Sequence, residues 1–584
     1  MRTRALLLLS VVALAGIAAY APTGDPDLWW HLATARDALA DPAHANVDHF
    51  SYSYAGTVLR HRDALAQQVL YRGYLVLGCA WFVLLKACAA ALQGVALWVS
   101  QPRRQRSVLA TLAGTIALLA TLRLVERPNL FTVALFPLFV ALLERARRSL
   151  PEPRVATRLA TVVACAGLWM ALHRGGLLSI PLLVLFAFHA TVAYLVPAAT
   201  AQRWLGERAT RDAMGLAWLA ATLALALTLF LPGGISVLAS GVGVVEGTSL
   251  RSSISEWTRL TPQGLVQHFP LAMVLALLGL VSVVRSLVVR GALGLWHLGL
   301  LALFAVATLD SVRWVPYLAV VAVQVVVLAV GTRWHAWEQS PKLRLLPLLV
   351  AAAGIACLVG THGGPFEVGE DVSRTPRAAA DLVATERLGD RVANALELGG
   401  YLVWRNGTHL RVLVDGRNET LYPPGFVGRA LEAEHDRAMF QAMRAADGAT
   451  VVVAVNTPGR MTTSFLRDDP AWALVGWSDP ATVWVRRDAH AELAARLGYR
   501  LLDPRAIDGS VARALATGAD REQLFRELGR MVTENPEAVR PLVALAVYHH
   551  LTGDDTRRDT VLARLETLAP DHPAIQALRA RFAR

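Results

Sequence analysis

Two carboxylates, Asp25 and Asp27, stand directly after the first apolar segment of the chain, in the sequence GDPDLWWH that runs from Gly24 to His31. An acid pair at the edge of a bilayer is costly unless water reaches it and the protein uses it. Asp25 followed by Pro26 is typical of a helix N-terminus, so capping could account for one carboxylate. We predict Asp27 as a general base towards a hydroxyl nucleophile, with Asp25 as the alternative. The same two residues are the candidates for holding a divalent metal ion.

Cationic and polar side chains recur in later segments between the apolar runs. Arginine binds phosphate oxygens in a bidentate manner. A structural ion pair is the alternative for several of these residues, because Arg127 follows Glu126 directly and Arg313 follows Asp310 closely. No Walker-type or G-x-G-x-x-G loop occurs, so nucleotide chemistry is not supported. The predicted substrate- and phosphate-binding residues are His31, His61, Arg127, Arg174, Glu256 and Arg313.

The composition indicates a membrane protein with many spans. The chain has 584 residues, of which 54% are hydrophobic and 17% charged, and its mean hydropathy is +0.41. These values differ strongly from those of ordinary soluble domains. We interpret the net charge of +12 as loop charge that fixes topology and meets anionic lipid headgroups, and we expect no nucleic-acid binding. The four cysteines lie in apolar runs without the spacing of a metal or redox site.

A membrane span needs about 20 mostly apolar residues. By that criterion we expect about 11 spans, near residues 5–22, 74–99, 107–123, 129–144, 158–173, 176–197, 214–232, 269–289, 292–309, 312–331 and 345–361. Arginines concentrate in alternate loops, which predicts a cytoplasmic N-terminus and an extracytoplasmic C-terminus. The first apolar segment is expected to stay as a signal anchor, with a cleaved signal peptide as the alternative. In the first outside loop, DPDLWWHLATARDALAD and the segment around HRDALAQQ are predicted interfacial helices.

After the last apolar segment the composition changes to that of a soluble domain. LRVLVDG, ATVVVAV and ATVWVRRD alternate with helical stretches, as in an α/β domain. In the first of these, Asp415-Gly416-Arg417 predicts a turn, with acceptor binding by Arg417 or Tyr422 as the alternative. We expect a membrane domain over residues 1–361 that includes a long outside loop at 23–70. An α/β domain at 362–504 and a helical tail at 505–584 follow, the tail being either tetratricopeptide-like or a plain helical hairpin.

DPDLWWHL, ERPNLFT, LWMALHRGG, ISEW, RWVPYLA, and GGYLVWR with VLVDGR together resemble the motifs of a widespread bacterial family of multispanning membrane proteins. That family is often placed near the GT-C class of polyprenyl-phosphate-sugar glycosyltransferases, and its members often carry tetratricopeptide-like C-termini. The resemblance covers roughly residues 1–430. It implies a mainly α, GT-C-like membrane bundle in the bacterial inner membrane, acting on the cell envelope. It also implies that an aspartate of the first outside loop, here Asp25 or Asp27, acts as base or metal contact.

The predicted function is therefore transfer of a sugar from a polyprenyl-phosphate donor to an extracytoplasmic glycan, lipid or protein acceptor. Asp27 would take the proton of the acceptor hydroxyl, and cations would stabilise the leaving lipid phosphate. A transporter or flippase for a lipid or glycan is one alternative, but few ionisable residues lie within the spans and inverted repeats are not evident. A membrane scaffold that binds a protein partner through its helical tail is the other.

Overall fold

The computed structural model describes residues 2–59, 63–231, 234, 258–289, 291, 293–361, 367–389, 391–423, 425–569 and 572–582. The chain divides into two compact units. The membrane unit comprises Met1–Thr23 and Arg60–Gly369, and the C-terminal unit comprises Gly24–Leu59 and Glu370–Arg584. Most of the first long loop thus groups with the C-terminal residues, whereas the sequence-based division assigned it to the membrane domain. The cause is a helix in this loop whose apolar face packs on a helix of the C-terminal unit.

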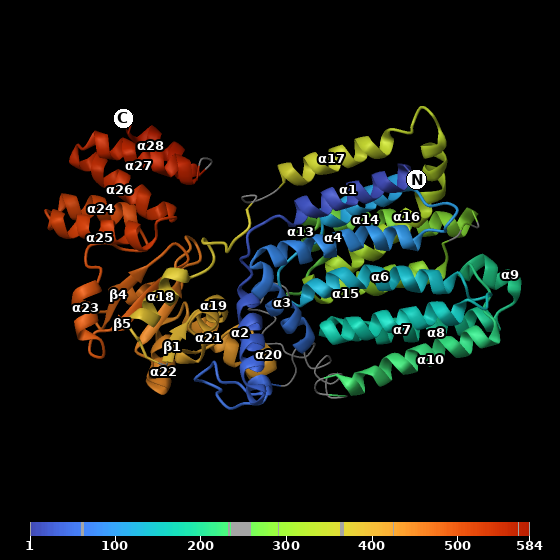
Figure 1. Cartoon of the computed structure of the whole chain (residues 1–584), viewed down its shortest axis with the longest axis horizontal. Coiled ribbons are helices and arrows are strands. Elements are labelled where there is room, and N and C mark those ends of the chain that lie inside the picture. Colours follow the sequence, from blue (N-terminus) through green and yellow to red (C-terminus); the bar gives the residue numbers. More distant parts are fainter. Residues whose placement is uncertain are drawn as a thin grey trace. The chain divides into compact units, whose positions relative to one another are not determined.

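The membrane unit is a bundle of helices, most of them long and apolar (Figure 1). Within it α4 packs against α1 and α6, and α14 packs against α16. Its helices are α1 (Arg2–Ala19), α3 (Ala64–Leu77), α4 (Ala80–Ser100), α5 (Val108–Leu119), α6 (Asn129–Arg147), α7 (Val155–Leu172), α8 (Ser179–Leu195), α9 (Ala198–Thr200), α10 (Arg211–Leu227), α13 (Pro262–His268), α14 (Pro270–Val289), α15 (Leu295–Asp310), α16 (Val315–Gln339) and α17 (Leu346–Gly360).

The apolar helices lie where the sequence predicts membrane spans. Among the described residues, seven helical stretches are long and apolar enough to cross a membrane, and shorter apolar helices occupy Leu7–Ala19, Val108–Leu119, Leu295–Asp310 and Leu346–Gly360. Each predicted range overlaps one of these helices. One boundary differs, because the range expected to begin at residue 74 is interrupted by Gly78, whose φ of +57° ends α3. The chain is thus a multi-pass membrane protein with a mainly helical fold.

Two buried glutamines bind backbone carbonyls beside a proline inside helix α6, and one of them replaces the hydrogen bond that the proline cannot donate. Pro137 has no N–H to donate to the carbonyl of Val133, which would leave that acceptor unsatisfied in the bundle. Gln93 of α4 donates to the Val133 carbonyl at 2.7 Å, and Gln324 of α16 donates to the Pro137 carbonyl at 2.7 Å. Gln93 and Gln324, two polar side chains within apolar spans, therefore hold neighbouring helices together.

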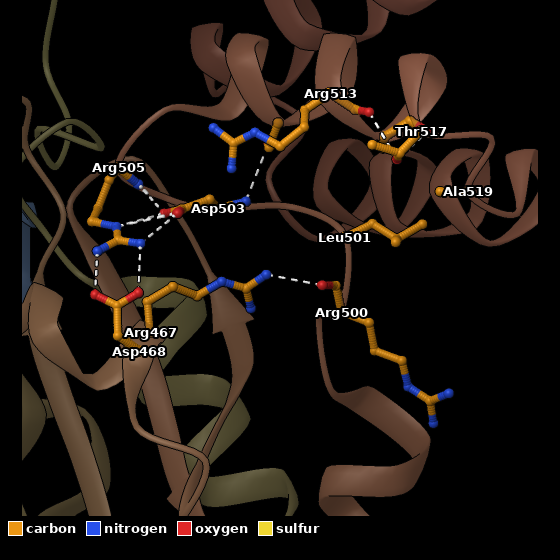
Figure 2. A pocket seen from close by; sticks show the side chains of 11 residues that line it. Arg467, Asp468, Arg500, Leu501, Asp503, Arg505, Arg513, Thr517 and Ala519 are labelled. Atoms are coloured by element: carbon orange, nitrogen blue, oxygen red, sulfur yellow. Dashed lines mark hydrogen bonds and ion pairs between the residues drawn. The ribbon is translucent and has the colours of Figure 1, made fainter.

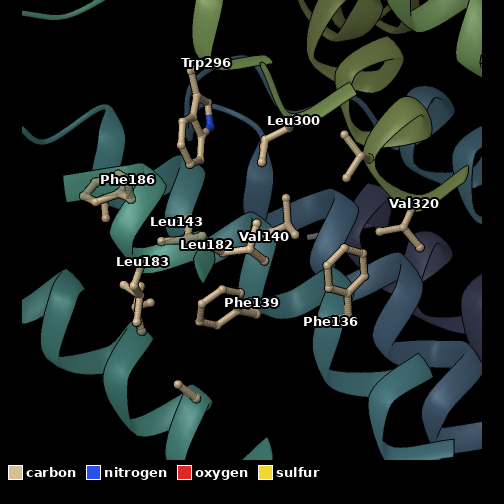
Figure 3. Close-up of a cluster of buried hydrophobic side chains, with 14 of the residues drawn as sticks. Phe136, Phe139, Val140, Leu143, Leu182, Leu183, Phe186, Trp296, Leu300 and Val320 are labelled. Carbon is tan, nitrogen blue, oxygen red and sulfur yellow. The ribbon is translucent and has the colours of Figure 1, made fainter. Parts of the chain in front are cut away.

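The core of the membrane unit is apolar and aromatic (Figure 3). Burying such side chains contributes about 1.5–3 kcal/mol each in water, whereas inside a bilayer close packing is the main stabilising term. The cluster joins helices α6, α8, α15 and α16 through Phe136, Phe139, Val140, Leu143, Leu182, Leu183, Phe186, Trp296, Leu300 and Val320.

The C-terminal unit contains a five-stranded sheet with strand order β2-β1-β3-β5-β4. Strands β2, β1 and β3 run parallel to one another, while β5 is antiparallel to both β3 and β4. The strands are β1 (Arg391–Asn394), β2 (Arg411–Val412), β3 (Val451–Val455), β4 (Trp472–Trp477) and β5 (Ala481–Arg486). The helices are α2 (Pro26–Ala40), α18 (Arg377–Thr385), α19 (Leu396–Asn406), α20 (Asn418–Leu421), α21 (Phe426–Ala433), α22 (Arg437–Asp447) and α23 (Ala491–Leu497), followed by the C-terminal helices.

The predicted α/β character of this unit is confirmed. LRVLVDG, ATVVVAV and ATVWVRRD contain β2, β3 and β5. Two strands were not predicted, because β1 (RVAN) and β4 (WALVGW) each contain a single β-branched residue and lack the valine-rich runs of the predicted strands. The tail forms α24 (Ile507–Ala516), α25 (Arg521–Glu534), α26 (Val539–Thr552), α27 (Asp555–Leu568) and α28 (Pro573–Phe582). A tetratricopeptide-like relation among them stays a prediction.

A buried carboxyl should make the stability of the C-terminal unit depend on pH. Burial raises the pKa of Glu434 from 4.5 to about 7, while its Oε1 accepts a hydrogen bond from the Leu396 N–H at 2.9 Å. A carboxyl with a raised folded pKa stabilises the fold below its unfolded pKa, and that contribution is lost as the pH rises through about 7. Glu434→Gln keeps the acceptor and removes the charge. At about pH 8 we expect the variant to have a free energy of unfolding about 1–3 kcal/mol higher than that of the wild type. Its thermal midpoint should be higher accordingly.

The measurement is thermal unfolding of the full chain in detergent, followed by tryptophan fluorescence. At about pH 4, below the unfolded pKa of 4.5, Glu434 is neutral in the folded state and mostly neutral in the unfolded state, so the two midpoints should nearly coincide. A lower midpoint for Glu434→Gln than for the wild type at about pH 8 would contradict the claim that ionised Glu434 destabilises the folded state.

Candidate functional site

The motif GDPDLWWH forms the beginning of helix α2, and the two aspartates play different parts in it. Asp25 is the N-cap residue, and its Oδ1 accepts a hydrogen bond from the Asp27 N–H at 3.0 Å. Pro26 occupies the first helical position, where its missing N–H costs no hydrogen bond. The predicted capping is thus confirmed for Asp25. Asp27 lies in the first turn, where a carboxylate also complements the helix dipole.

The Asp27 carboxylate lies against the backbone of Gly416. A Cβ at residue 416 would fall 2.0 Å from Asp27 Oδ1 and 2.7 Å from Trp30 Nε1, so only glycine fits there. The indole N–H of Trp30 is buried and has no hydrogen-bond partner within the part of the chain that the structure describes. A buried donor without a partner is costly and commonly marks a place that water or a ligand occupies. A half-buried carboxylate and a buried indole N–H therefore meet at the turn Asp415-Gly416-Arg417.

Helix α2 packs on helix α19, which carries the motif GGYLVWR. The ring of Trp29 meets Tyr401 edge-on at 5.0 Å between centroids. Arg36 donates to the Trp404 carbonyl at 2.7 Å and lies over the Trp404 ring. A Cβ at Gly400 would lie 2.8 Å from the Pro26 carbonyl oxygen, which explains a glycine at this close approach. Trp29 is therefore buried against protein in this unit and does not serve as an interfacial anchor.

The turn Asp415-Gly416-Arg417 is held by a buried charge cluster. Arg417 is 2% exposed, and its guanidinium binds Asp415 through contacts of 2.6–3.1 Å and also pairs with Asp48 of the first loop. Asp48 in turn accepts from the N–H groups of Phe50 and Ser51. The two carboxylates raise the pKa of Arg417 well above its usual range, although burial opposes this. The predicted turn is confirmed, and Arg417 anchors the first loop. Tyr422, the other acceptor-binding candidate, is also buried.

In the membrane unit, Asp63 lies near two of the predicted phosphate-binding arginines, Arg174 and Arg313. Asp63 directly precedes α3, and its Oδ1 accepts from the Arg174 N–H at 3.2 Å. Burial raises the pKa of Asp63 to about 6, and the charges of Arg174 and Arg313 oppose that rise. Asp63 was not among the predicted site residues. Its only signal was a charged HRD triplet immediately before an apolar helix.

The motif ALHRGG builds a tight turn beside this cluster. His173 ends α7, and its Nδ1 accepts from the Gly175 N–H at 3.0 Å and lies 2.7 Å from Thr132 Oγ1. The ring proton of His173 therefore belongs on Nε2, because Nδ1 is an acceptor. Trp169 donates to the same Thr132 hydroxyl at 2.8 Å. A Cβ at Gly176 would come within 2.4 Å of the Met170 nitrogen, so this backbone approach requires glycine.

The remaining predicted residues have varied surroundings. Glu126 forms a buried ion pair with Lys86 of α4 at 2.6 Å, a partner that the sequence pattern did not predict. Arg127 lies in the next position, in the turn before α6. Asp310 has Arg259 at 3.5 Å. His31 is buried in α2 with its ring 3.5 Å from that of Trp30. His61 and Glu256 lie outside the described residues.

The structure thus places the predicted site residues in both units. Asp25, Asp27 and His31 belong to the C-terminal unit, whereas Arg127, Arg174 and Arg313 belong to the membrane unit. Among the described residues there is no group of three or more His, Cys, Asp or Glu side chains that could hold a metal ion. Asp25 and Asp27 remain the two carboxylates proposed for that role.

No protein-family model and no curated protein matches the chain. Solved structures do resemble it. The oligosaccharyltransferase of Archaeoglobus fulgidus, tethered to an acceptor peptide containing the NVT sequon, matches with a TM-score of 0.52 at 13% identity, over 78% of this chain and 69% of that one. The archaeal oligosaccharyltransferase AglB from Archaeoglobus fulgidus, in complex with an inhibitory peptide and a dolichol-phosphate, matches with a TM-score of 0.51 at 12% identity, over 78% and 69%.

The apo form of the Archaeoglobus fulgidus enzyme matches with a TM-score of 0.52 at 13% identity, over 77% of this chain and 69% of that one. At these identities the likeness concerns the fold, and it extends over more than three quarters of the chain. The chain therefore has the GT-C-like fold of a membrane oligosaccharyltransferase.

Proposed function

We propose that this protein is a membrane glycosyltransferase that moves a sugar from a polyprenyl-phosphate donor to an extracytoplasmic glycan, lipid or protein acceptor. The observation that carries the proposal is the fold likeness to an oligosaccharyltransferase, one of whose structures is a complex with a peptide and a dolichol-phosphate. The apolar helices supply the bilayer setting that a lipid-linked donor needs.

Arg174 and Arg313 would bind the phosphate of the donor, with Arg127 as a further candidate. The Arg174 N–H donates to Asp63, and the charges of both arginines act on the Asp63 carboxyl, so the two residues lie near the same group. When the bond between sugar and phosphate breaks, negative charge grows on the leaving phosphate. A preorganised donor aimed at such charge is worth about 3–4 kcal/mol of barrier lowering.

Asp27 would accept the proton of the acceptor hydroxyl while its oxygen attacks the anomeric carbon. The bond from the anomeric carbon to the phosphate oxygen breaks in the same displacement, which inverts the configuration at that carbon. Asp25 is less suited to this role because its carboxylate already accepts the hydrogen bond that caps α2. A divalent cation, where one takes part, would be held by Asp25 and Asp27 and would supply positive charge to neutralise the donor phosphate.

The test uses the purified full chain in lipid vesicles with a synthetic polyprenyl-phosphate donor carrying a labelled sugar. Envelope glycans, lipids and peptides are offered as acceptors, and the released polyprenyl phosphate is measured alongside transferred label. Transfer with inversion is the expected result. Movement of the intact donor across the vesicle membrane without release of polyprenyl phosphate would overturn the proposal in favour of a flippase.

Donor binding should depend on pH through Asp63. The donor phosphodiester keeps one negative charge at neutral pH, whereas the pKa of Asp63 lies at about 6. Protonation of Asp63 removes a negative charge close to Arg174 and Arg313, whereas ionised Asp63 competes with the donor phosphate for their positive charge. We therefore expect the KM for the donor to rise several-fold between about pH 5 and about pH 7.

In the matched variant Asp63→Asn the KM should be low and nearly constant over the same range. The quantity to measure is the KM at each pH, separately from kcat, because a general base would affect kcat. An unchanged pH dependence of KM in Asp63→Asn would show that Asp63 does not control donor binding.

A further inference from the structure

A basic cleft in the C-terminal unit lies apart from the residues discussed so far. It has a volume of about 330 Å³, and Figure 2 shows the side chains that line it. Its walls come from the short helix at Ser464–Asp468, from the segment 500–505 and from α24 with the turn that follows it. The lining residues are Arg467, Asp468, Arg500, Leu501, Asp503, Arg505, Ser510, Arg513, Ala514, Thr517 and Ala519.

Arg505 forms ion pairs with both acidic residues of the cleft lining. Arg505 binds Asp468 through two contacts of 2.7 and 3.0 Å. It also binds Asp503, through contacts of 2.8–3.2 Å. The two carboxylates are thereby held at one end of the cleft, as Figure 2 shows. The charge of Arg467 also acts on both carboxylates, but neither forms an ion pair with it among the described residues, so positive charge remains in the cleft.

Arg467 and Arg513 supply that positive charge. Arg467 donates to the carbonyl oxygens of Tyr499 and Arg500 at 3.1 and 2.9 Å, contacts that fix its guanidinium without neutralising it. The side chain of Arg513 has neither a hydrogen bond nor an ion pair with any residue that the structure describes. In Figure 2 the guanidinium of Arg500 points away from the other charged groups.

The rest of the lining is apolar or small. Leu501 is half-buried, and Ala514 is 6% exposed. Arg467 and Arg513 can bind an anionic group, and Leu501 and Ala514 can contact an apolar part of the same ligand. The cleft therefore suits an organic anion better than an inorganic ion. The planar fork of arginine matches a carboxylate or a phosphate group, and the volume is at the lower end of the range for small-molecule sites.

We propose that this cleft is a binding site for a small organic anion, such as a sugar unit that bears a carboxylate or phosphate group. The anionic group would bind Arg513 and Arg467, and the body of the ligand would lie on Leu501 and Ala514. The site is separate from the proposed transfer chemistry and does not depend on it.

The experiment is calorimetric titration of the full chain in detergent at low ionic strength. The probes are short galacturonate oligomers, mannose phosphate, neutral galactose oligomers and inorganic phosphate. Binding of either charged sugar, with weaker binding of inorganic phosphate and none of the neutral sugar, is expected. The preferred charged probe then distinguishes a uronate-bearing glycan from a sugar phosphate as the source of the anion.

Three variants locate the site. Arg513→Gln should weaken binding about tenfold. Arg500→Gln should change it by less than about threefold, and Arg521→Gln, an exposed arginine outside the cleft lining, should leave it unchanged. Thermal midpoints without ligand should be the same in all of them, since none of the replaced side chains has a hydrogen bond or ion pair within the described ranges. Failure of both charged sugars to bind, equal binding of inorganic phosphate, or full binding by Arg513→Gln would overturn the proposal.

Discussion

Replacing Arg417 with methionine should lower the free energy of unfolding of the C-terminal unit by about 3–5 kcal/mol, because it leaves two buried carboxylates without their cation. Asp48 and Asp415 are both fully buried, and Arg417 is the residue that pairs with each of them. The cost comes from the uncompensated charge, so it should be far larger than the loss of one hydrogen bond. Thermal unfolding of the full chain in detergent measures it.

A matched control is available on α19. Arg405 pairs with Asp381 at 2.7 Å, but the two side chains are 48% and 45% exposed. Arg405→Met should therefore change stability by no more than about 1 kcal/mol. The double variant Arg417→Met with Asp48→Asn removes one of the stranded charges and should recover part of the loss. Equal effects of Arg417→Met and Arg405→Met would refute the role of the cluster as an anchor of the first loop.

The ion pairs of Arg417 show why its role was harder to predict from sequence than the capping role of Asp25. The capped helix at Asp25 depends on neighbours in sequence, so its residue pattern was sufficient to predict it. The apolar helices were predictable for a similar reason, since length and hydropathy define them. Arg417 could not be assigned in this way, because its second partner, Asp48, comes from the other end of the chain.

Packing between distant parts of the chain also determines which residues meet at the candidate site, and sequence patterns did not predict these contacts. Asp27, Trp30 and Gly416 meet because α2 lies on α19, and no spacing rule links residues nearly 390 positions apart. Asp63 had no recognisable motif, and its importance follows from the arginines that the fold brings beside it. The strands β1 and β4 were missed because each has a single β-branched residue, so neither shows the valine-rich pattern that identified the other strands. Sequence thus predicted the classes of element and several of the residues, while pairing required the structure.

Asp27→Asn should reduce the rate of sugar transfer by about a hundredfold or more, the usual contribution of a general base. The fold should be unaffected, because asparagine keeps the size of the side chain and the capping bond comes from Asp25. Asp25→Asn is the matched control: asparagine is as good an N-cap as aspartate, so this variant should retain most of the transfer activity. The measurement is single-turnover transfer from the labelled polyprenyl-phosphate donor in vesicles.

Gly416→Ala tests the position of the same carboxylate without changing its chemistry. The added Cβ would fall 2.0 Å from Asp27 Oδ1, so the carboxylate must move. We expect kcat to fall with little change in the KM for the donor, because the phosphate-binding arginines are not altered. Gly399→Ala does not serve as a control, since its Cβ would meet the Val414 carbonyl oxygen at 2.2 Å. Gly448→Ala, with open space around it, controls for a glycine substitution as such, although its φ of +68° adds backbone strain. Full transfer by both Asp27→Asn and Gly416→Ala, together with loss of kcat in Asp63→Asn, would move the role of base from Asp27 to Asp63.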